Sequence, residues 1–226
     1  MSLNYADLKG MLLHTLGATE GTTYSDALLY ESVINAFDAI LPWVPNQAIA
    51  DLTSGSGMDM TMPDDCYRIE AVYDLEDGLV LERTHITANK QMPKQSQTTR
   101  TGPYNWVEYP KNHINFLQVP YSNVGAGVEG RDFRVFYIAY WDKPTDKDDD
   151  TFVLTFPVSA LAGVLYWAAA HCLVPGATVS SQIRQFNTRV DSGQPTDNVL
   201  EQEIKFLRGM FLDEMNRQPK YIGPSL

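Results

Sequence analysis

The chain has 226 residues, of which 44% are hydrophobic, and contains two cysteines. This apolar content suffices for one domain with an excursion, or for two small domains, without disulfides. The formal net charge of −11 excludes general nucleic-acid binding, which needs clustered Lys and Arg against the phosphates.

The N-terminal part predicts two helices. Residues 4–16 place three leucines on one stripe, and residues 25–41 carry an apolar face at helical spacing. Pro42 and Pro45 close the second helix, and the weaker pattern of residues 46–53 predicts one or two more helical turns. The start of the chain has no basic segment before an apolar one, so we expect no signal peptide and use in the cytosol.

The middle of the chain predicts strands joined by long loops. Residues 54–63 form a linker rich in Gly, Ser and Met, after which the hydrophobic period changes to two. Two hairpins and one strong final strand follow, with long polar or glycine-rich loops over residues 84–102 and 119–130. The predicted strands are 65–73, 79–83, 105–109, 113–117 and 133–141.

The longest apolar run, residues 156–173, predicts a central buried helix. Pro157 suits its first turn, and Pro175 with Gly176 predicts its end. A membrane span is the alternative, because the run approaches the length that a span needs. The acidic flank of residues 146–150 favours the buried helix.

Two further helices complete the prediction. Residues 178–190 suggest a short helix, and residues 196–217 a last helix with Phe211 and Met215 in its apolar seam. A tail of residues 218–226 follows.

The order of these elements predicts an α+β fold, mainly a helical bundle. Four to five helices from both chain ends would form the bundle, with an inserted antiparallel β-hairpin region and long loops. The expected divisions are 1–53 and 151–217 for the helices, 54–150 for the β region, and 218–226 for the extended tail.

The motifs in the sequence predict neither an enzyme nor a cofactor or metal site. Residues 125–130 fit a Gly-x-Gly-x-x-Gly pattern, but a strand follows it where a dinucleotide site needs a helix. The acidic run at residues 146–150 lacks the ligand spacing of an EF-hand. Cys66 and Cys172 are expected to be free thiols, and the histidines show no ligand spacing.

Aromatic residues in the loops and tail suggest protein contacts, because such side chains bury a large area at low entropy cost. The alternative is that most of them cover the β segment. The aromatic residues in question are Tyr104, Trp106, Tyr121 and Tyr221.

Several segments, in order, resemble the head–tail connector adaptor proteins of tailed bacteriophages. Residues 62–73 (MPDDCYRIEAVY) resemble that family's strand entry, with Pro-Asp, an aromatic residue and Arg. Residues 101–104 (TGPY) resemble its Thr-Gly-x-Pro-x-Tyr stretch, with the proline one place early. Residues 133–144 resemble its strand ending in aromatics and Pro, and residues 156–170 its Leu-Pro helix with small residues.

The resemblance implies a virion protein of the neck, made in the host cytoplasm. It implies a ring of twelve copies beneath the portal protein, a body formed by a helical bundle, and a channel through which genomic DNA passes without specific binding. The hairpins and loops would contact neighbouring copies or the next tail or neck component, and no membrane is involved. The implied portal contacts are Phe211, Met215, Tyr221 and Ile222, and the implied subunit or tail contacts are Tyr104, Trp106 and Tyr121.

Two alternative functions remain open at this point. The first is a tail-side ring protein, such as a tail terminator or completion protein. The second is an enzyme with an unrecognised site.

Overall fold

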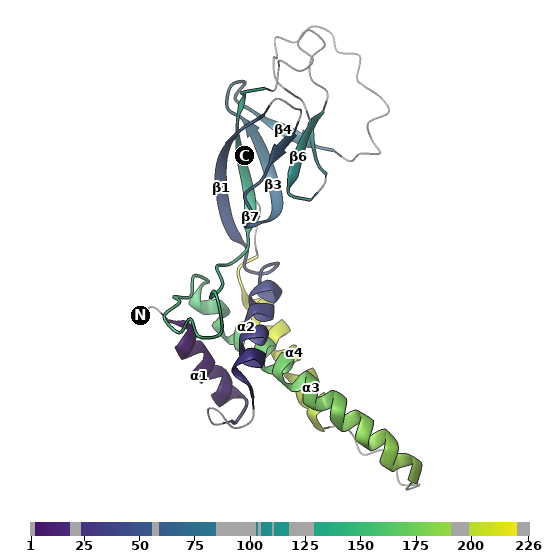
Figure 1. The fold of residues 1–226 in the computed structure, drawn as a ribbon. Coiled ribbons are helices and arrows are strands. Elements are labelled where there is room, and N and C mark those ends of the chain that lie inside the picture. The colour runs from purple at the N-terminus through teal and green to yellow at the C-terminus, as the bar shows by residue number, and fades with distance from the viewer. Residues whose placement is uncertain are drawn as a thin grey trace. The chain divides into compact units, whose positions relative to one another are not determined.

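The computed structural model describes residues 3–18, 24–55, 59–84, 103, 105–109, 111–117, 129–190 and 199–220. The chain divides into two compact units, which are described separately (Figure 1). The helical unit comprises the described residues of Met1–Pro45 and Trp141–Tyr221, and the sheet unit those of Asn46–Tyr140.

The helical unit begins with two capped helices, α1 (Tyr5–Thr15) and α2 (Asp26–Ile40). Asn4 and Asp7 form a capping box at the start of α1, in which each side chain bonds the other residue's backbone N–H. Ser25 caps α2 by accepting a hydrogen bond from the N–H of Leu28. Both predicted N-terminal helices are confirmed.

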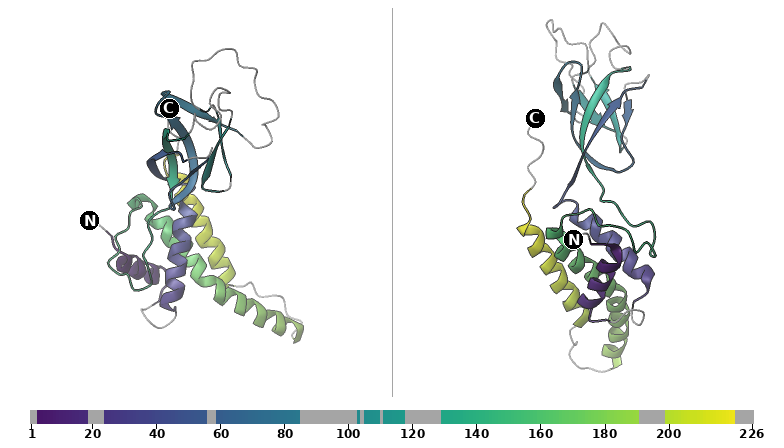
Figure 2. Two further views of the ribbon diagram at one scale, coloured as in Figure 1. Left: turned by 45° about the horizontal axis from the view of Figure 1, so that its top comes forward. Right: turned by 90° about the vertical axis from the view of Figure 1, so that its left-hand side faces the viewer.

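Two longer helices complete this unit. A 3-10 turn, η3 (Val158–Ala160), leads into α3 (Leu161–Val190), and α4 (Val199–Arg217) packs along α3. The helix α3 also contacts α1 and α2, and its small residues Ala168, Ala169 and Ala170 are buried. The C-terminal part of α3 extends past the other helices of its unit (Figures 1 and 2).

The sheet unit contains one seven-stranded sheet. Its neighbours run in the order β1, β7, β3, β4, β5, β6, β2, and all pairs are antiparallel except β4 with β5. The aromatic and β-branched strand β7 lies between β1 and β3, where both its edges are paired. The strands are β1 (Asn46–Thr53), β2 (Asp59–Thr61), β3 (Cys66–Asp74), β4 (Leu79–Arg83), β5 (Asn105–Glu108), β6 (His113–Leu117) and β7 (Asp132–Ala139).

The sheet curls around its own core. Register shifts interrupt the β3–β7 ladder at two places, between Cys66 and Arg68 and between Ile69 and Ala71. Such bulges bend and twist a strand. The inner face of the curled sheet collects one apolar cluster, with Trp106, Phe116 and Phe133 among its largest buried side chains.

The prediction that the fold is mainly a helical bundle is wrong. The chain is a mixed α/β protein, in which the curled seven-stranded sheet forms a compact unit of its own. Residues 46–53 are the strand β1 and not helical turns, and the expected linker 54–63 contains β2. The physical reason is long-range pairing, because β1 gains its stability from β7, about eighty residues further along the chain.

The predicted end of the central helix is also wrong. The helix α3 passes through Pro175 and continues to Val190, so residues 178–190 belong to it. Proline removes one helical hydrogen bond but kinks a helix as often as it ends one. Both predicted hairpins, the strong strand near residue 133 and the last helix are confirmed as β3–β4, β5–β6, β7 and α4.

Candidate functional site

Three of the seven predicted contact residues lie in described parts of the chain, and all three are buried. Phe211 and Met215 lie in the seam between α3 and α4, where Phe211 packs against the ring of Trp167. Trp106 belongs to the core of the curled sheet. The predicted contacts Tyr104, Tyr121, Tyr221 and Ile222 lie outside the described residues.

One cluster in the helical unit has the residue types of a nucleophilic site. The hydroxyl of Ser32 lies 3.0 Å from Nδ1 of His171 and accepts a hydrogen bond from the Cys172 thiol at 3.1 Å. However, the same hydroxyl donates to the carbonyl of Leu28 at 2.6 Å, and Ser32 is fully buried. Burial raises the pKa of the Cys172 thiol, which keeps it protonated. The cluster therefore joins α2 to α3 and presents no accessible nucleophile.

A second polar group lies between α1, α2 and the acidic turn. The ammonium of Lys9 pairs with Asp150 at 2.7 Å and lies over the ring of Tyr5. Lys9 and Asp150 border a hollow of about 310 Å³, which Asp26 and His14 also line. Because the Lys9 charge is already matched by Asp150, this group stabilises the start of α1 and assembles no reactive pair.

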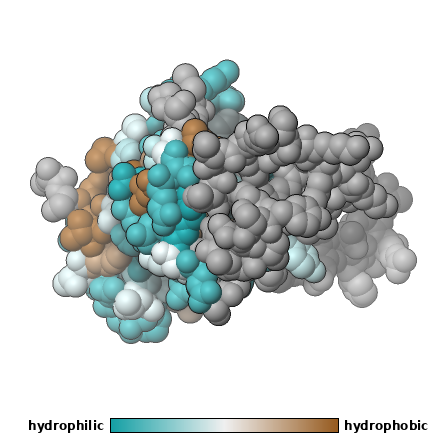
Figure 3. Space-filling view, turned by 90° about the horizontal axis from the view of Figure 1, so that it is seen from above, coloured by the Kyte–Doolittle hydropathy of each residue, from teal (hydrophilic) through white to brown (hydrophobic). Residues whose placement is uncertain are grey.

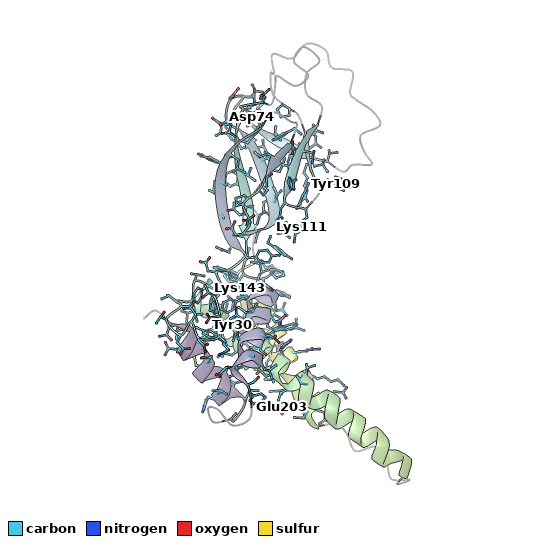
Figure 4. The ribbon with its side chains drawn as sticks, viewed as in Figure 1. Tyr30, Asp74, Tyr109, Lys111, Lys143 and Glu203 are labelled. Atoms are coloured by element: carbon cyan, nitrogen blue, oxygen red, sulfur yellow. The ribbon has the colours of Figure 1, made fainter. Side chains whose placement is uncertain are left out.

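The acidic turn itself satisfies its carboxylates locally. Asp149 accepts from Thr145, and Asp148 pairs with Lys147 at 2.9 Å. Across the described part of the chain, no group of three His, Cys, Asp or Glu side chains is arranged to hold a metal ion. Nearby, the hydroxyl of Tyr30 donates to the carbonyl of Pro144, which ties the turn to α2 (Figure 4).

The central helix has the length and composition of a membrane span over Val158–Pro175. In the structure, this segment packs against α1, α2 and α4 as the core helix of its unit. The buried core helices of many proteins pass the same test of length and composition.

The turn between β3 and β4 is the most elaborately bonded site in the sheet unit. The guanidinium of Arg131, which is 5% exposed, bonds both carboxylate oxygens of Asp74 through Nε at 3.0 and 2.9 Å. The same guanidinium pairs with Glu76 at 3.0 Å and with Asp77 at 2.8 Å. The carboxylates of Asp74 and Asp77 hold the pKa of Arg131 above its ordinary value in spite of burial. One buried cation thus fixes three residues of a single turn.

This turn carries a group of exposed apolar side chains that the sequence did not single out. We call residues 75–80 the hairpin tip; its exposed apolar members are Leu75, Leu79 and Val80. Leu79 and Val80 are consecutive strand residues, so their side chains point to opposite faces, and both are exposed. The available signal was the run of three apolar residues directly after Asp77-Gly78, where a hairpin end is normally polar.

Comparison of the sequence with models of known protein families and with curated proteins found no match. The function proposed below therefore depends on the sequence pattern and on the surfaces of the two units.

Proposed function

We propose that this chain is a structural protein of a tailed-bacteriophage virion, an adaptor that forms a ring beneath the portal. In this role it links the capsid vertex to the tail and lines the channel through which DNA leaves. The order of the segments 62–73, 101–104, 133–144 and 156–170 supports this proposal, because it resembles the order in known adaptors.

Exposed apolar side chains on both units are the observation that carries the proposal. Apolar side chains that gather on a surface mark sites of protein contact. A protein that has them on each of two units suits a position between two partners. Leu75, Leu79 and Val80 come from one turn of the sheet unit, and Val158, Phe206 and Leu212 are exposed in the helical unit.

The charge of the chain suits the lining of a DNA channel. With a formal net charge of −11, a ring of copies repels phosphates and lets them pass without adhering. The proposed partners are the portal protein, neighbouring copies in a ring of twelve, and the next tail or neck component.

The portal contacts are assigned to the C-terminal tail, with Tyr221 and Ile222 as the contact residues. The last helix holds the base of this tail, because Phe211 and Met215 bury their side chains against α3. Gln218, at the end of α4, is further tied to Ser159 through its amide nitrogen and oxygen.

The direct test of the proposal is the presence of the chain in purified particles. Quantitative mass spectrometry of virions should find it at about the copy number of the portal protein, and labelling should place it at the neck in electron micrographs. Its absence from particles that contain portal protein contradicts the proposal.

A second experiment tests the assignment of the tail. Deletion of residues 218–226 should abolish binding to purified portal protein in a pull-down, while the far-ultraviolet circular dichroism stays unchanged. Unchanged portal binding removes the tail from the contact.

A further inference from the structure

The hairpin tip exposes apolar side chains in a place where turns are normally polar. Leu75 is 37% exposed, Leu79 46% and Val80 44%. Asp74, which precedes them, lies at the upper end of the sheet unit in the view of Figure 4. The space-filling view of Figure 3 shows brown, apolar side chains at the surface beside hydrophilic ones.

The backbone of the hairpin tip is held in one conformation. The carboxylate of Asp74 accepts hydrogen bonds from the N–H groups of Glu76 and Asp77 at 3.0 and 3.2 Å. The N–H of Gly78 donates to the Asp74 carbonyl at 3.0 Å, and its φ of +67° is a conformation that glycine adopts without strain.

Arg131 anchors the same residues from the start of β7, through its pairs with Asp74, Glu76 and Asp77. A loop that is already ordered loses little conformational entropy when it binds. Less of the favourable free energy of its apolar contacts is therefore offset, and the affinity is higher. The hairpin tip therefore has the physical properties of a preformed docking element.

The charge around the hairpin tip indicates its partner. Among the residues that the structure describes, three carboxylates face the guanidinium of Arg131, which gives this part of the surface a formal excess of negative charge beside the apolar side chains. The Glu76 carboxylate is 54% exposed, so this charge reaches solvent. An anionic lipid surface or the same acidic hairpin tip of a second copy is repelled, whereas a pocket bordered by Lys and Arg is attracted.

We propose that the hairpin tip inserts Leu75, Leu79 and Val80 into an apolar pocket, bordered by basic residues, on another protein of the virion. The identity of the partner as a virion component rests on the proposed function, and the surface and its chemistry rest on the structure. The tip is thus the contact of the sheet unit, distinct from the C-terminal tail.

The test complements a phage that lacks this gene with full-length variants. Leu79→Ser combined with Val80→Ser removes the apolar side chains without adding charge. Ile49→Ser is the matched control, because Ile49 is exposed on β1 of the same unit, outside the hairpin tip. The readouts are melting temperature, copies per purified particle, the fraction of complete particles and infectious titre.

We expect the double variant to melt like the wild type and to lower the yield of complete particles by about tenfold or more, as loss of an interface anchor does. Ile49→Ser should leave the yield unchanged. Glu76→Gln should lower the yield less, because it removes one exposed charge and leaves the apolar side chains in place.

Four outcomes overturn the proposal. If the double variant gives as many complete particles as the wild type, the hairpin tip is not a docking element, and the proposed adaptor function is unaffected. If the double variant changes the oligomeric mass of the purified protein in light scattering, the partner of the hairpin tip is a second copy of this chain. If the wild type binds phosphatidylcholine–phosphatidylglycerol vesicles and the double variant does not, the partner of the hairpin tip is a lipid surface. Absence of the wild-type chain from particles overturns both the proposed function and this inference.

Discussion

At the scale of single residues, Arg131 holds a charge that is almost completely removed from water. Moving such an ion out of water costs several kcal/mol, which its attraction to the fully buried Asp74 must offset. The network also includes Ser54, whose hydroxyl accepts from the N–H of Arg131 at 3.2 Å. The chain thus joins the end of β1, the end of β3 and the start of β7 through polar contacts.

Replacing Arg131 with Met should destabilise the sheet unit strongly. The substitution leaves Asp74 buried without its cation, which costs about 3–5 kcal/mol. Urea unfolding of the variant measures the loss. Arg134→Met is the matched control, because Arg134 pairs with Asp51 at 2.7 Å on the exposed surface, where such pairs contribute about 1 kcal/mol or less. Equal losses for both variants would contradict the assigned role of burial.

Cys66 makes the stability of the sheet unit depend on alkaline pH. Burial, with the nearby Glu108 and Asp65 carboxylates, raises the pKa of its thiol from 9.0 to about 11. Between these values the unfolded chain releases a proton that the folded chain keeps, so the free energy of unfolding falls as pH rises through this window. The loss from this thiol should be roughly 2 kcal/mol.

The measurement is the urea midpoint at pH 8 and at pH 11, for the wild type and for Cys66→Ala. Tyrosines whose pKa is also raised, such as Tyr5 and Tyr137, lower stability in the same direction in both proteins. The difference between the two pH profiles therefore isolates the thiol. Parallel profiles would show that Cys66 titrates alike in the folded and unfolded chain.

At the scale of elements, the seam between α3 and α4 depends on a close approach at Gly163. A Cβ at this position would fall against the terminal methyl group of Met215, with Phe211 next to it. Methionine is flexible, so a single methyl group could be accommodated, but a branched side chain could not.

We expect Gly163→Val to cost about 1–3 kcal/mol from overpacking. Met215→Ala should recover part of this loss, and the coupling in a double-mutant cycle measures the contact. Gly209→Val is the control, because Gly209 lies on α4 with no neighbour within 4 Å of its Cβ position. A large cost at Gly209 as well would attribute the effect to helix propensity and not to packing.

Elements with a strong local signal could be predicted from the sequence. The caps Asn4 and Ser25 mark the starts of α1 and α2, and the aromatic and β-branched run of β7 allows little except a strand. The strand β1 could not be predicted, because its alternation of half-buried Ala and Leu with exposed residues has meaning only beside β7. The predicted helix end at Pro175 is wrong for a related reason, because packing of α3 against its neighbours outweighs the local helix-stop signal.

The candidate site was predicted less well than the fold elements. Aromatic character alone selected Trp106, which the curled sheet buries, since surface and core aromatics have the same sequence signal. The hairpin tip was missed because its exposure depends on β5, which pairs with β4 only at Glu82 and Arg83 and leaves Leu79 and Val80 beyond its end.

At the scale of the whole molecule, the sheet unit is an insertion between two parts of the helical unit. The chain leaves the helical unit after Pro45 and re-enters it at Trp141. The indole N–H of Trp141 donates to the carbonyl of Val44 at 3.1 Å, which holds the two crossing points together within the helical unit. The insertion therefore begins and ends at neighbouring points.

A chain in which a short Gly-Ser turn joins Pro45 to Trp141 should fold as the helical unit alone. Asn46 and Ala139, which lie next to the two ends, are register partners about 5 Å apart, and Trp141 bonds the carbonyl of Val44, so a short turn can connect the ends. Circular dichroism should show a helical spectrum and a cooperative thermal transition. A broad, non-cooperative transition would show that the helical unit needs the sheet unit to fold.

The antiparallel pairing of β1 with β7 also determines how the chain responds to tension. Within the described residues, the two covalent links to the helical unit leave from one end of two adjacent strands. A force that draws the sheet unit away is therefore shared by two backbones that move together, and the hydrogen bonds between these strands are not sheared. Such a junction can bear a pulling force without detaching the edge strand β1 from β7.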